Sequence, residues 1–398
     1  LESGIGVDTA SDRELSQAIS LGGNADNLVL TAAIKTESMV ELALLNNVPI
    51  IVDNRDELLL IDEMAGKLKR IAAIGLRLSG FRHKNKKLYS RFGFDIDSDA
   101  PHLISWFNGP PRFHNLHLVG LHFHLDGYSA AQRSEAILQA VTFKGRLKEA
   151  GSSIDFLDIG GGIPMNYLKS EQEWRDFKMG LKQSVFGDRE PITFGNDGLG
   201  YEKNATTKSI TGSMRTYPYY NDLHTVSFLG QVLDYKGETD STSVVEAIRR
   251  EGLQLRIEPG RSLLDQVGIT IARVAHRKRD SNGDWLVGLE MNMSQLRSSS
   301  RDFLVDPFVV YDQGPSAGEG EEMYFTGAYC LEQDVIMKRK FRFPKLPSIG
   351  DSVVFINTGG YMMHFYETEA HLFALSKNLY ISNVNDIVKD AVILDELL

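Results

Sequence analysis

Short apolar runs alternate with amphipathic stretches along the first 260 residues. Each run has the length of a buried strand, and most are followed by a segment whose apolar positions have helical spacing. Such alternation predicts a parallel sheet covered by helices. The predicted strands are 5–8, 28–30, 49–52, 72–78, 118–124, 155–160 and 253–257; the predicted helices are 13–19 (capped by Ser11), 36–45, one after Asn54, 130–150 and 171–181, and the stretch 246–251 precedes the last strand.

After residue 261 the pattern changes. Apolar runs at 267–274, 285–290, 308–311, 324–330 and 352–357 follow one another without long helices, which predicts a β-rich domain. The division expected is therefore a barrel domain over residues 1–261 and a C-terminal β-domain over 262–398.

Between about residues 185 and 243 the alternation is interrupted, and Gly, Asn and Asp become frequent. A long irregular segment inside a compact domain is usually functional or disordered, so we expect an insertion in the barrel. Tyr217, Tyr219 and Tyr220 in this segment either line the mouth of a substrate site or pack as a small local core.

Five residues with ligand-binding chemistry fall at the carboxyl ends of different predicted strands: Asp8, Arg77, His124, Gly160 and Glu258. Convergence of this kind is typical of the mouth of a TIM-type α/β barrel rather than the crevice of an open sheet. A closed barrel needs eight strands and about seven are counted, so the first strand is expected upstream of residue 1.

Composition narrows the functional classes. The 398 residues are 42% hydrophobic and 24% charged, as in ordinary globular proteins, and the net charge of -10 argues against a nucleic-acid partner. The single cysteine, Cys330, excludes an intrachain disulfide and predicts a reducing, cytoplasmic compartment. No apolar run approaches the roughly 20 residues of a membrane span. The sequence starts with Leu1 rather than Met, so a targeting segment before it would not be visible.

The segment 257–261, Ile-Glu-Pro-Gly-Arg, places an acid at a strand end, followed by a strand-breaking proline, a glycine and an arginine. A carboxylate and a guanidinium at one strand end suit a ligand with a cationic ring on one side and a phosphate on the other. The simpler alternative is a surface turn with a local ion pair.

Three consecutive glycines, Gly160, Gly161 and Gly162, follow a predicted strand directly. Such a loop exposes backbone N–H groups that can bind a phosphate, although a tight turn would have the same sequence.

His122 and His124 lie at i and i+2 and therefore on the same face of a strand. A metal site needs further ligands at suitable spacing, and the nearest candidates, Asp126 and His114, form no such pattern. We therefore expect no metal, and a role for the histidines in the core or in stacking on a ligand.

In combination, these motifs resemble the fold type III (alanine-racemase-like) pyridoxal-phosphate enzymes, and specifically their decarboxylase branch, which includes ornithine, arginine and diaminopimelate decarboxylases. The resemblance rests on the order Asp8, Arg77, His124, the triple glycine and Glu258 along the chain. Further matches are 6–11 with the family's Asp-x-Ala-Ser, 91–93 with Lys-Phe-Gly, 327–334 with Gly-Pro-x-Cys-x-x-x-Asp, and 357–361 with Gly-Ala-Tyr.

The resemblance implies a role for each matched residue. Glu258 would pair with the pyridine nitrogen of pyridoxal 5'-phosphate and keep it protonated. His124 would stack on the ring, and Cys330 would reach in from the partner subunit of a homodimer, so these three form the implied catalytic set. The implied cofactor-binding residues are Asp8 and Arg77 as supporting groups, and Gly160, Gly161, Gly162, Gly260, Arg261 and Tyr361 at the phosphate.

The lysine that binds the cofactor as a Schiff base lies, in this family, on the first barrel strand. No residue of this sequence matches it, so it is expected upstream of Leu1, with the missing strand. Lys35 resembles a different lysine of the family and is not assigned this role.

Other departures from the family concern the phosphate and the substrate. Asp126-Gly127 replaces the usual Gly-Ser after the stacking histidine, which removes a hydroxyl unless Tyr128 or Ser129 substitutes for it.

Leu331 occupies a position that is often acidic in the family, which leaves Glu332 and Asp334 as candidates for contacting substrate. Asp306, before Pro307, stands where diaminopimelate decarboxylases have an Arg-Pro segment, which argues against a diacid substrate. Asp306 either contacts a cationic group or caps a turn.

The resemblance implies a pyridoxal-phosphate-dependent lyase of amino-acid metabolism that converts an amino acid to an amine and CO2. A racemase is the alternative within the class, but there the ring nitrogen faces an arginine and a tyrosine is the opposing base, so Glu258 and Cys330 argue against it. A non-catalytic pyridoxal-phosphate-binding protein is the other alternative, if the lysine is absent.

Overall fold

The computed structural model describes residues 5–107, 112–149, 153–237, 241–298, 302–312, 319–383 and 386–389. The chain divides into two compact units, each built from two separate stretches. The first unit comprises Leu1–Pro164 and Leu223–Gly260, and the second comprises Met165–Asp222 and Arg261–Leu398. The chain therefore passes from one unit to the other three times.

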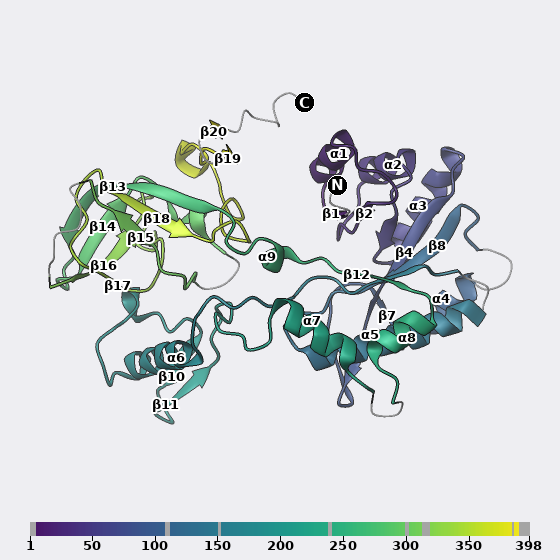
Figure 1. Ribbon diagram of the computed structural model, residues 1–398, viewed down its shortest axis with the longest axis horizontal. Helices are drawn as coiled ribbons and strands as arrows, with labels where there is room; N and C mark the ends of the chain where they lie inside the picture. Colours follow the sequence, from purple (N-terminus) through teal and green to yellow (C-terminus); the bar gives the residue numbers. More distant parts are fainter. Residues whose placement is uncertain are drawn as a thin grey trace. The chain divides into compact units, whose positions relative to one another are not determined.

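The first unit contains a parallel sheet of seven main strands, in agreement with the strand count and the TIM-like fold predicted from the sequence (Figure 1). The spatial order β1-β2-β3-β4-β8-β9-β12 follows the chain, and the sheet is open, with β1 and β12 at its two ends. The strands are β1 (Val7–Thr9), β2 (Leu28–Leu30), β3 (Ile50–Val52), β4 (Ala72–Ser79), β8 (Leu116–His122), β9 (Phe156–Asp158) and β12 (Gln254–Arg256), with β7 (Phe94–Asp95) beside β4 and a small hairpin of β5 (Arg82–His83) and β6 (Lys86–Lys87).

Three helices of this unit begin where capping residues in the sequence predicted, whereas the helices Ala100–Phe107 and Thr225–Asp234 were not predicted. Ser11, Thr36 and Asn54 each accept a hydrogen bond from a backbone N–H three residues ahead, which satisfies a free donor at the helix start. The helices are α1 (Asp12–Ser20), α2 (Glu37–Leu45), α3 (Arg55–Lys67), α4 (Ala100–Phe107), α5 (Ala130–Glu149), α7 (Thr225–Asp234) and α8 (Val244–Arg250). Among the described residues, no helix is long and apolar enough to cross a membrane.

The strands β2, β3 and β9 are buried on both faces of the sheet, and successive side chains join different clusters because they point to opposite faces. On β3, Ile50 and Val52 pack in the large core beneath the helices, whereas Ile51 joins a small cluster on the other face with Val29 and Phe156. Gly120 on β8 leaves the space that the Phe156 ring occupies, since a Cβ there would lie 2.1 Å from the ring.

The second unit is built around a six-stranded sheet in the order β15-β18-β13-β14-β16-β17 (Figure 1). A β-rich C-terminal domain was predicted, but the short strand β17 was missed. The elements are α6 (Glu171–Phe186), η1 (Phe194–Asn196), β10 (Tyr201–Asn204), β11 (Ser209–Gly212), α9 (Gly260–Leu263, which crosses the boundary), β13 (Ile269–Arg279), β14 (Trp285–Leu289), η2 (Met293–Leu296), β15 (Phe308–Val310), β16 (Glu321–Thr326), β17 (Phe341–Phe343), β18 (Ser352–Ile356), η3 (Ala370–Leu372), β19 (Leu379–Asn383) and β20 (Asp386–Lys389).

The segment that leaves the barrel differs from the insertion expected at about 185–243. It runs from Met165 to Asp222 and includes α6, which had been expected to cover the barrel. Apolar packing explains the difference. Trp174 and Leu181 of α6 are buried in the core of the second unit, whereas Phe228 and Val232 of α7 are buried in the core of the first.

Candidate active site

Glu258 lies two residues beyond the end of β12, beside the loop that follows β9. The hydrogen-bond ladder continues past both strands: the Ile159 N–H donates to the Arg256 carbonyl at 3.0 Å, and the Glu258 N–H donates to the Gly160 carbonyl at 3.1 Å. The next residue, Pro259, has no N–H and ends the pairing. The two segments singled out in the sequence are thus fixed next to each other.

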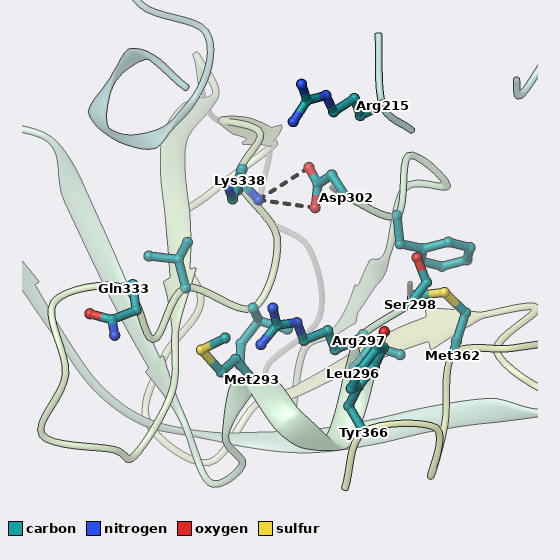
Figure 2. A pocket seen from close by; sticks show the side chains of 13 residues that line it. Arg215, Met293, Leu296, Arg297, Ser298, Asp302, Gln333, Lys338, Met362 and Tyr366 are labelled. Atoms are coloured by element: carbon teal, nitrogen blue, oxygen red, sulfur yellow. Dashed lines mark hydrogen bonds between the residues drawn. The ribbon is translucent and has the colours of Figure 1, made fainter. Parts of the chain in front are cut away.

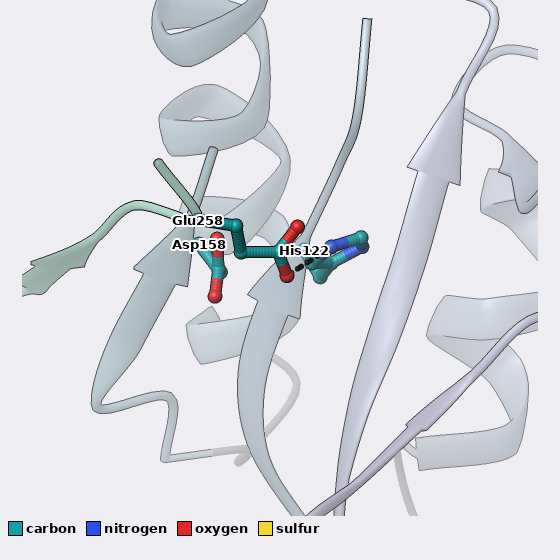
Figure 3. A group of neighbouring side chains, drawn as sticks. All are labelled: His122, Asp158 and Glu258. Carbon is teal, nitrogen blue, oxygen red and sulfur yellow. Dashed lines mark hydrogen bonds and ion pairs between the residues drawn. The ribbon is translucent and has the colours of Figure 1, made fainter. Parts of the chain in front are cut away.

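Two histidines flank the Glu258 carboxylate. The Nε2 atom of His122 lies 3.2 Å from Oε1, and the Nδ1 atom of His124 lies 3.6 Å from Oε2. Figure 3 shows His122 and Glu258 pointing toward each other, although β9 lies between their strands, β8 and β12, in the sheet. Burial on its own would raise the pKa of Glu258, but the interactions with His122 and His124 outweigh it and lower the pKa to about 2. Glu258 is therefore ionised at neutral pH.

Two more carboxyl groups border Glu258. Asp158 is the last residue of β9, and Asp8 is on β1. Burial, followed by the charge of Glu258, raises the pKa of both, that of Asp8 to about 7. Glu258 is thus the most readily ionised carboxyl group of the three, and a cationic group would meet its charge there.

The triple glycine adopts a shape that other residues would not tolerate. Gly160 and Gly162 have positive φ values of 66° and 74°. A Cβ on Gly160 would lie 2.7 Å from His124 Nδ1, and one on Gly161 would lie 2.6 Å from the Glu258 carbonyl oxygen. The loop is therefore packed against His124 and Glu258, which is more than a simple tight turn requires.

Arg77 on β4 is part of the same group. Its guanidinium lies 3.7 Å from Asp53 and 4.2 Å from the centre of the Phe92 ring, and burial lowers its pKa. Gly93, next to Phe92, donates its N–H to Asp53 at 3.0 Å. The structure thus brings Asp8, Arg77, His124, the glycine loop and Glu258 to one edge of the first unit.

The other residues predicted at the phosphate lie around the boundary and in the second unit. Gly260 donates its N–H to the Glu258 carbonyl at 3.0 Å. In the second unit, the Arg261 guanidinium lies 4.3 Å from the centre of the Tyr217 ring and 5.5 Å from that of Tyr361. Tyr361 has a φ of 65°, a strained value for a tyrosine and one that is often found at functional sites.

Cys330 lies in the loop 327–334 that follows β16. It is exposed and is therefore not part of the core. Asp334, in contrast, is buried and accepts hydrogen bonds from the N–H groups of Tyr329 and Met293, both at 2.7 Å. Its carboxylate thus shapes the loop, whereas Glu332 is exposed within it.

The remaining residues singled out in the sequence lie elsewhere in the second unit. Asp306 is exposed and forms an ion pair with Arg339. Tyr217 and Tyr219 are buried in the second core, as one of the two interpretations predicted, and Tyr220 packs against that core while partly exposed.

A cavity of about 440 Å³ lies within the second unit. Figure 2 shows that its lining combines Arg215, Arg297 and Asp302 with apolar side chains. Burial raises the pKa of Asp302 to about 6. Gln333, from the loop of Cys330, is among the lining residues, whereas the described lining does not include its neighbours Glu332 and Asp334.

His122, Asp158 and Glu258 also form the kind of cluster that could hold a metal ion, with one ligand atom of each within 4.8 Å of the others (Figure 3). A structural zinc site uses four ligands. Here the Glu258 carboxylate is hydrogen-bonded to His122, and the Asp158 carboxylate accepts a hydrogen bond of 2.9 Å from the Gly160 N–H. The arrangement suits a carboxylate that is positioned for a cationic ligand.

Sequence reasoning did not assign roles to three buried residues around this site: His122, Asp158 and Arg133. His122 had been noted only as part of a histidine pair. The position of Asp158, directly before the triple glycine, was a usable signal. Arg133 gave none, because an arginine in an amphipathic helix is normally expected on the surface.

Comparisons with known proteins indicate the family of the chain. Residues 1–185 match the family model described as pyridoxal-dependent decarboxylase, pyridoxal binding domain. The uncharacterized protein y4yA of Sinorhizobium fredii is 30% identical over 379 residues, which cover 93% of this chain and 75% of that protein. The diaminopimelate decarboxylase of Aquifex aeolicus is 29% identical over 182 residues, which cover 43% of this chain and 42% of that enzyme.

Among solved structures, diaminopimelate decarboxylase from Helicobacter pylori in complex with L-lysine superposes with a TM-score of 0.68 at 18% identity, over 98% of this chain and 81% of that one. At this identity the superposition supports the fold alone. Together with the sequence matches, it shows that the chain belongs to the fold type III family of pyridoxal-phosphate-dependent decarboxylases.

The residues present fit pyridoxal 5'-phosphate by their chemistry. Glu258 is an ionised acid, which suits a protonated ring nitrogen, and beside it lies a glycine loop that is packed too closely against its neighbours to carry side chains. Backbone N–H groups of such loops suit a phosphate.

Proposed function

We propose that the chain forms a homodimer that binds pyridoxal 5'-phosphate and decarboxylates an amino acid to an amine and CO2. The observation that carries the proposal is the Glu258 carboxylate, which His122 and His124 keep ionised beside the glycine loop. When bound, the cofactor supplies an electron sink for the carbanion that is left when CO2 departs.

Each residue of the site would then have a separate role. Glu258 holds the proton on the ring nitrogen, because an ionised carboxylate favours the charged pyridinium. His124 would cover one face of the ring, and the glycine loop and Gly260 would bind the phosphate. Cys330, exposed on its loop, serves the active site of the partner subunit by delivering a proton to the substrate carbon. Asp8 and Arg77 adjust the charge around Glu258.

A non-catalytic pyridoxal-phosphate-binding protein is the second candidate, because the environment of Lys35 does not suit a lysine that binds the cofactor covalently. The Lys35 ammonium is buried, lies 3.0 Å from Glu57 and donates to the Ala32 carbonyl at 2.6 Å, so it is not available to the cofactor. Catalysis therefore requires a lysine in another position, which the family places before the Asp-x-Ala-Ser motif.

The full-length protein with its cofactor can be tested on a panel of amino acids. CO2 release from carboxyl-labelled substrate and the enantiomeric composition of the remaining amino acid are measured together. Stoichiometric CO2 and amine support the proposal. Racemisation without CO2 would favour the racemase, and cofactor binding without either reaction would favour the non-catalytic alternative.

The variant Glu258→Gln tests the residue that carries the proposal. Each pKa unit lost from the ring nitrogen corresponds to about 1.4 kcal/mol, so turnover should fall by at least roughly 100-fold while the cofactor stays bound. The exposed Glu41→Gln serves as the matched control. Turnover near the wild-type value in Glu258→Gln would mean that the acid is structural.

A further inference from the structure

Arg133 is a buried cation directly behind the glycine loop. It belongs to α5 and is 1% exposed. Its Nη1 group donates a hydrogen bond of 2.6 Å to the carbonyl of Ile159, the residue before the three glycines. Its Nη2 atom lies 2.8 Å from the point where a Cβ on Gly162 would stand. The guanidinium thus touches both ends of the loop.

Among the described residues, Arg133 has no carboxylate partner. Two other cations are similarly buried, and both are paired: Lys35 with Glu57 at 3.0 Å and Lys144 with Glu251 at 2.9 Å. Within the part of the chain that the structure describes, the Nε atom of Arg133 has no hydrogen-bond partner, and burial lowers the pKa of the guanidinium to about 10. Arg133 therefore remains charged at neutral pH without a compensating negative group.

An isolated buried charge is costly, by several kcal/mol even after the protein relaxes. The position of Arg133 in the first turn of α5 adds to this cost, because the N-terminal end of a helix is itself positive. A site with these properties favours an anion. The planar guanidinium suits a phosphate, with which it can form two parallel hydrogen bonds.

We propose that Arg133 is a phosphate-binding residue, which supplies from behind the glycine loop the positive charge that neutralises a phosphate monoester bound there. This inference rests on the proposed function in one respect, since the phosphate monoester is that of pyridoxal 5'-phosphate. It assigns the recognition of the phosphate charge to a residue of the barrel itself.

The test compares two ligands that differ only in the phosphate. Dissociation constants for pyridoxal 5'-phosphate and for pyridoxal are measured by fluorescence titration of the apo full-length protein and of Arg133→Met. The variant should bind pyridoxal 5'-phosphate roughly 10- to 150-fold more weakly, because it lacks the charge-assisted hydrogen bonds to the phosphate. The affinity for pyridoxal should stay unchanged.

Thermal stability separates this role from a structural one. If Arg133 binds phosphate, the apo Arg133→Met protein should melt at the wild-type temperature or above, because an unpaired buried charge has been removed. Inorganic phosphate should raise the melting temperature of the wild type only. If Arg133 only holds the Ile159 carbonyl, the variant should melt lower and lose affinity for both ligands alike, which would overturn the inference.

Further variants keep the test decisive. Arg146→Met, at an exposed position of the same helix, should leave both constants unchanged. If Arg133→Met does not fold, Arg133→Lys replaces it, with roughly tenfold weaker binding of pyridoxal 5'-phosphate expected because the bidentate geometry is lost. An unchanged ratio of the two constants in the folded variant, or a wild type that binds pyridoxal as well as its phosphate, would overturn the inference. Phosphate-dependent binding without decarboxylation would instead contradict the proposed function alone.

Discussion

At the scale of single residues, the main feature of the site is that its three carboxyl groups differ in how readily they ionise. The interactions with two imidazole rings lower the pKa of Glu258 despite its burial, whereas burial, followed by the charge of Glu258, raises the pKa of Asp8 and Asp158. An amide at position 8 would imitate the protonated acid. This gives a test that does not depend on substrate.

We predict that Asp8→Asn changes the pH dependence of stability. The folded-state pKa of Asp8 is raised to about 7 from an ordinary value of 3.8, so between these values the folded protein holds a proton that the unfolded chain releases. The wild type should therefore become less stable relative to Asp8→Asn as the pH rises from about 4 to about 7. Melting temperatures of both proteins across this range measure the difference.

The exposed aspartate Asp188 provides the control. Asp188→Asn should show a constant offset from wild type over the same range. A constant offset for Asp8→Asn as well would mean that the carboxyl group at position 8 titrates normally.

Site residues could be predicted from the sequence where they belong to a local motif. They could not be predicted where tertiary packing brings them to the site. Glu258 and the glycine loop follow strands directly, so their meeting could be predicted from strand order. Arg133 could not be predicted, since its burial depends on the tertiary contact between α5 and the end of β9.

At the scale of elements, the packing of β8 against β9 limits which side chain position 120 can carry. A Cβ on Gly120 would stand 2.1 to 2.4 Å from three atoms of the Phe156 ring, which is 2% exposed and cannot move into solvent. The glycine is therefore a packing requirement of these two strands.

We predict that Gly120→Ala destabilises the protein by about 1–3 kcal/mol, the usual cost of overpacking a core. Denaturant unfolding measures this, and Phe156→Leu in the same chain should recover part of the loss. Gly145 on α5 is the matched control, because nothing lies within 4 Å of a Cβ there. Gly145→Ala should be neutral or stabilising by about 0.5–1 kcal/mol. Equal effects at the two positions would show that backbone entropy, not packing, decides.

Element prediction succeeded for the seven main strands and for α1, α2, α3 and α5 of the first unit, missed α4 and α7, and assigned α6 to the wrong unit for a physical reason. Capping residues and apolar periodicity are local signals, and Ser11, Thr36 and Asn54 mark their helices correctly. Which core a helix joins is not a local property: α6 has an ordinary amphipathic pattern, but its apolar face is buried in the second unit. The three-residue strand β17 is too short to show a period.

At the scale of the whole molecule, the proposed homodimer predicts that two crippled variants complement each other. His124 belongs to the first unit and Cys330 to the second, and a twofold interface would place the Cys330 loop of each subunit at the site of the other. When His124→Ala and Cys330→Ala are denatured and refolded together, half the dimers are hybrids, and each hybrid has one intact site. Decarboxylase activity should recover to roughly a quarter of wild type.

Before the comparison counts, Cys330→Ala alone must be inactive and dimeric by sedimentation. Activity that stays at the level of the separate variants would place both residues in a site made by a single chain.

The three crossings of the chain between its units have a consequence for synthesis on the ribosome. The sheet of the first unit is completed by β12, and β12 is made only after the whole Met165–Asp222 excursion. At about 5–20 residues per second, β9 waits roughly 5 to 20 s for its neighbour. During that time the nascent chain presents an unpaired strand edge, and the cluster of ionisable side chains around Glu258 has not yet formed. The N-terminal stretch is therefore not a unit that can mature by itself, and shielding of this edge is a natural task for a chaperone at the exit tunnel.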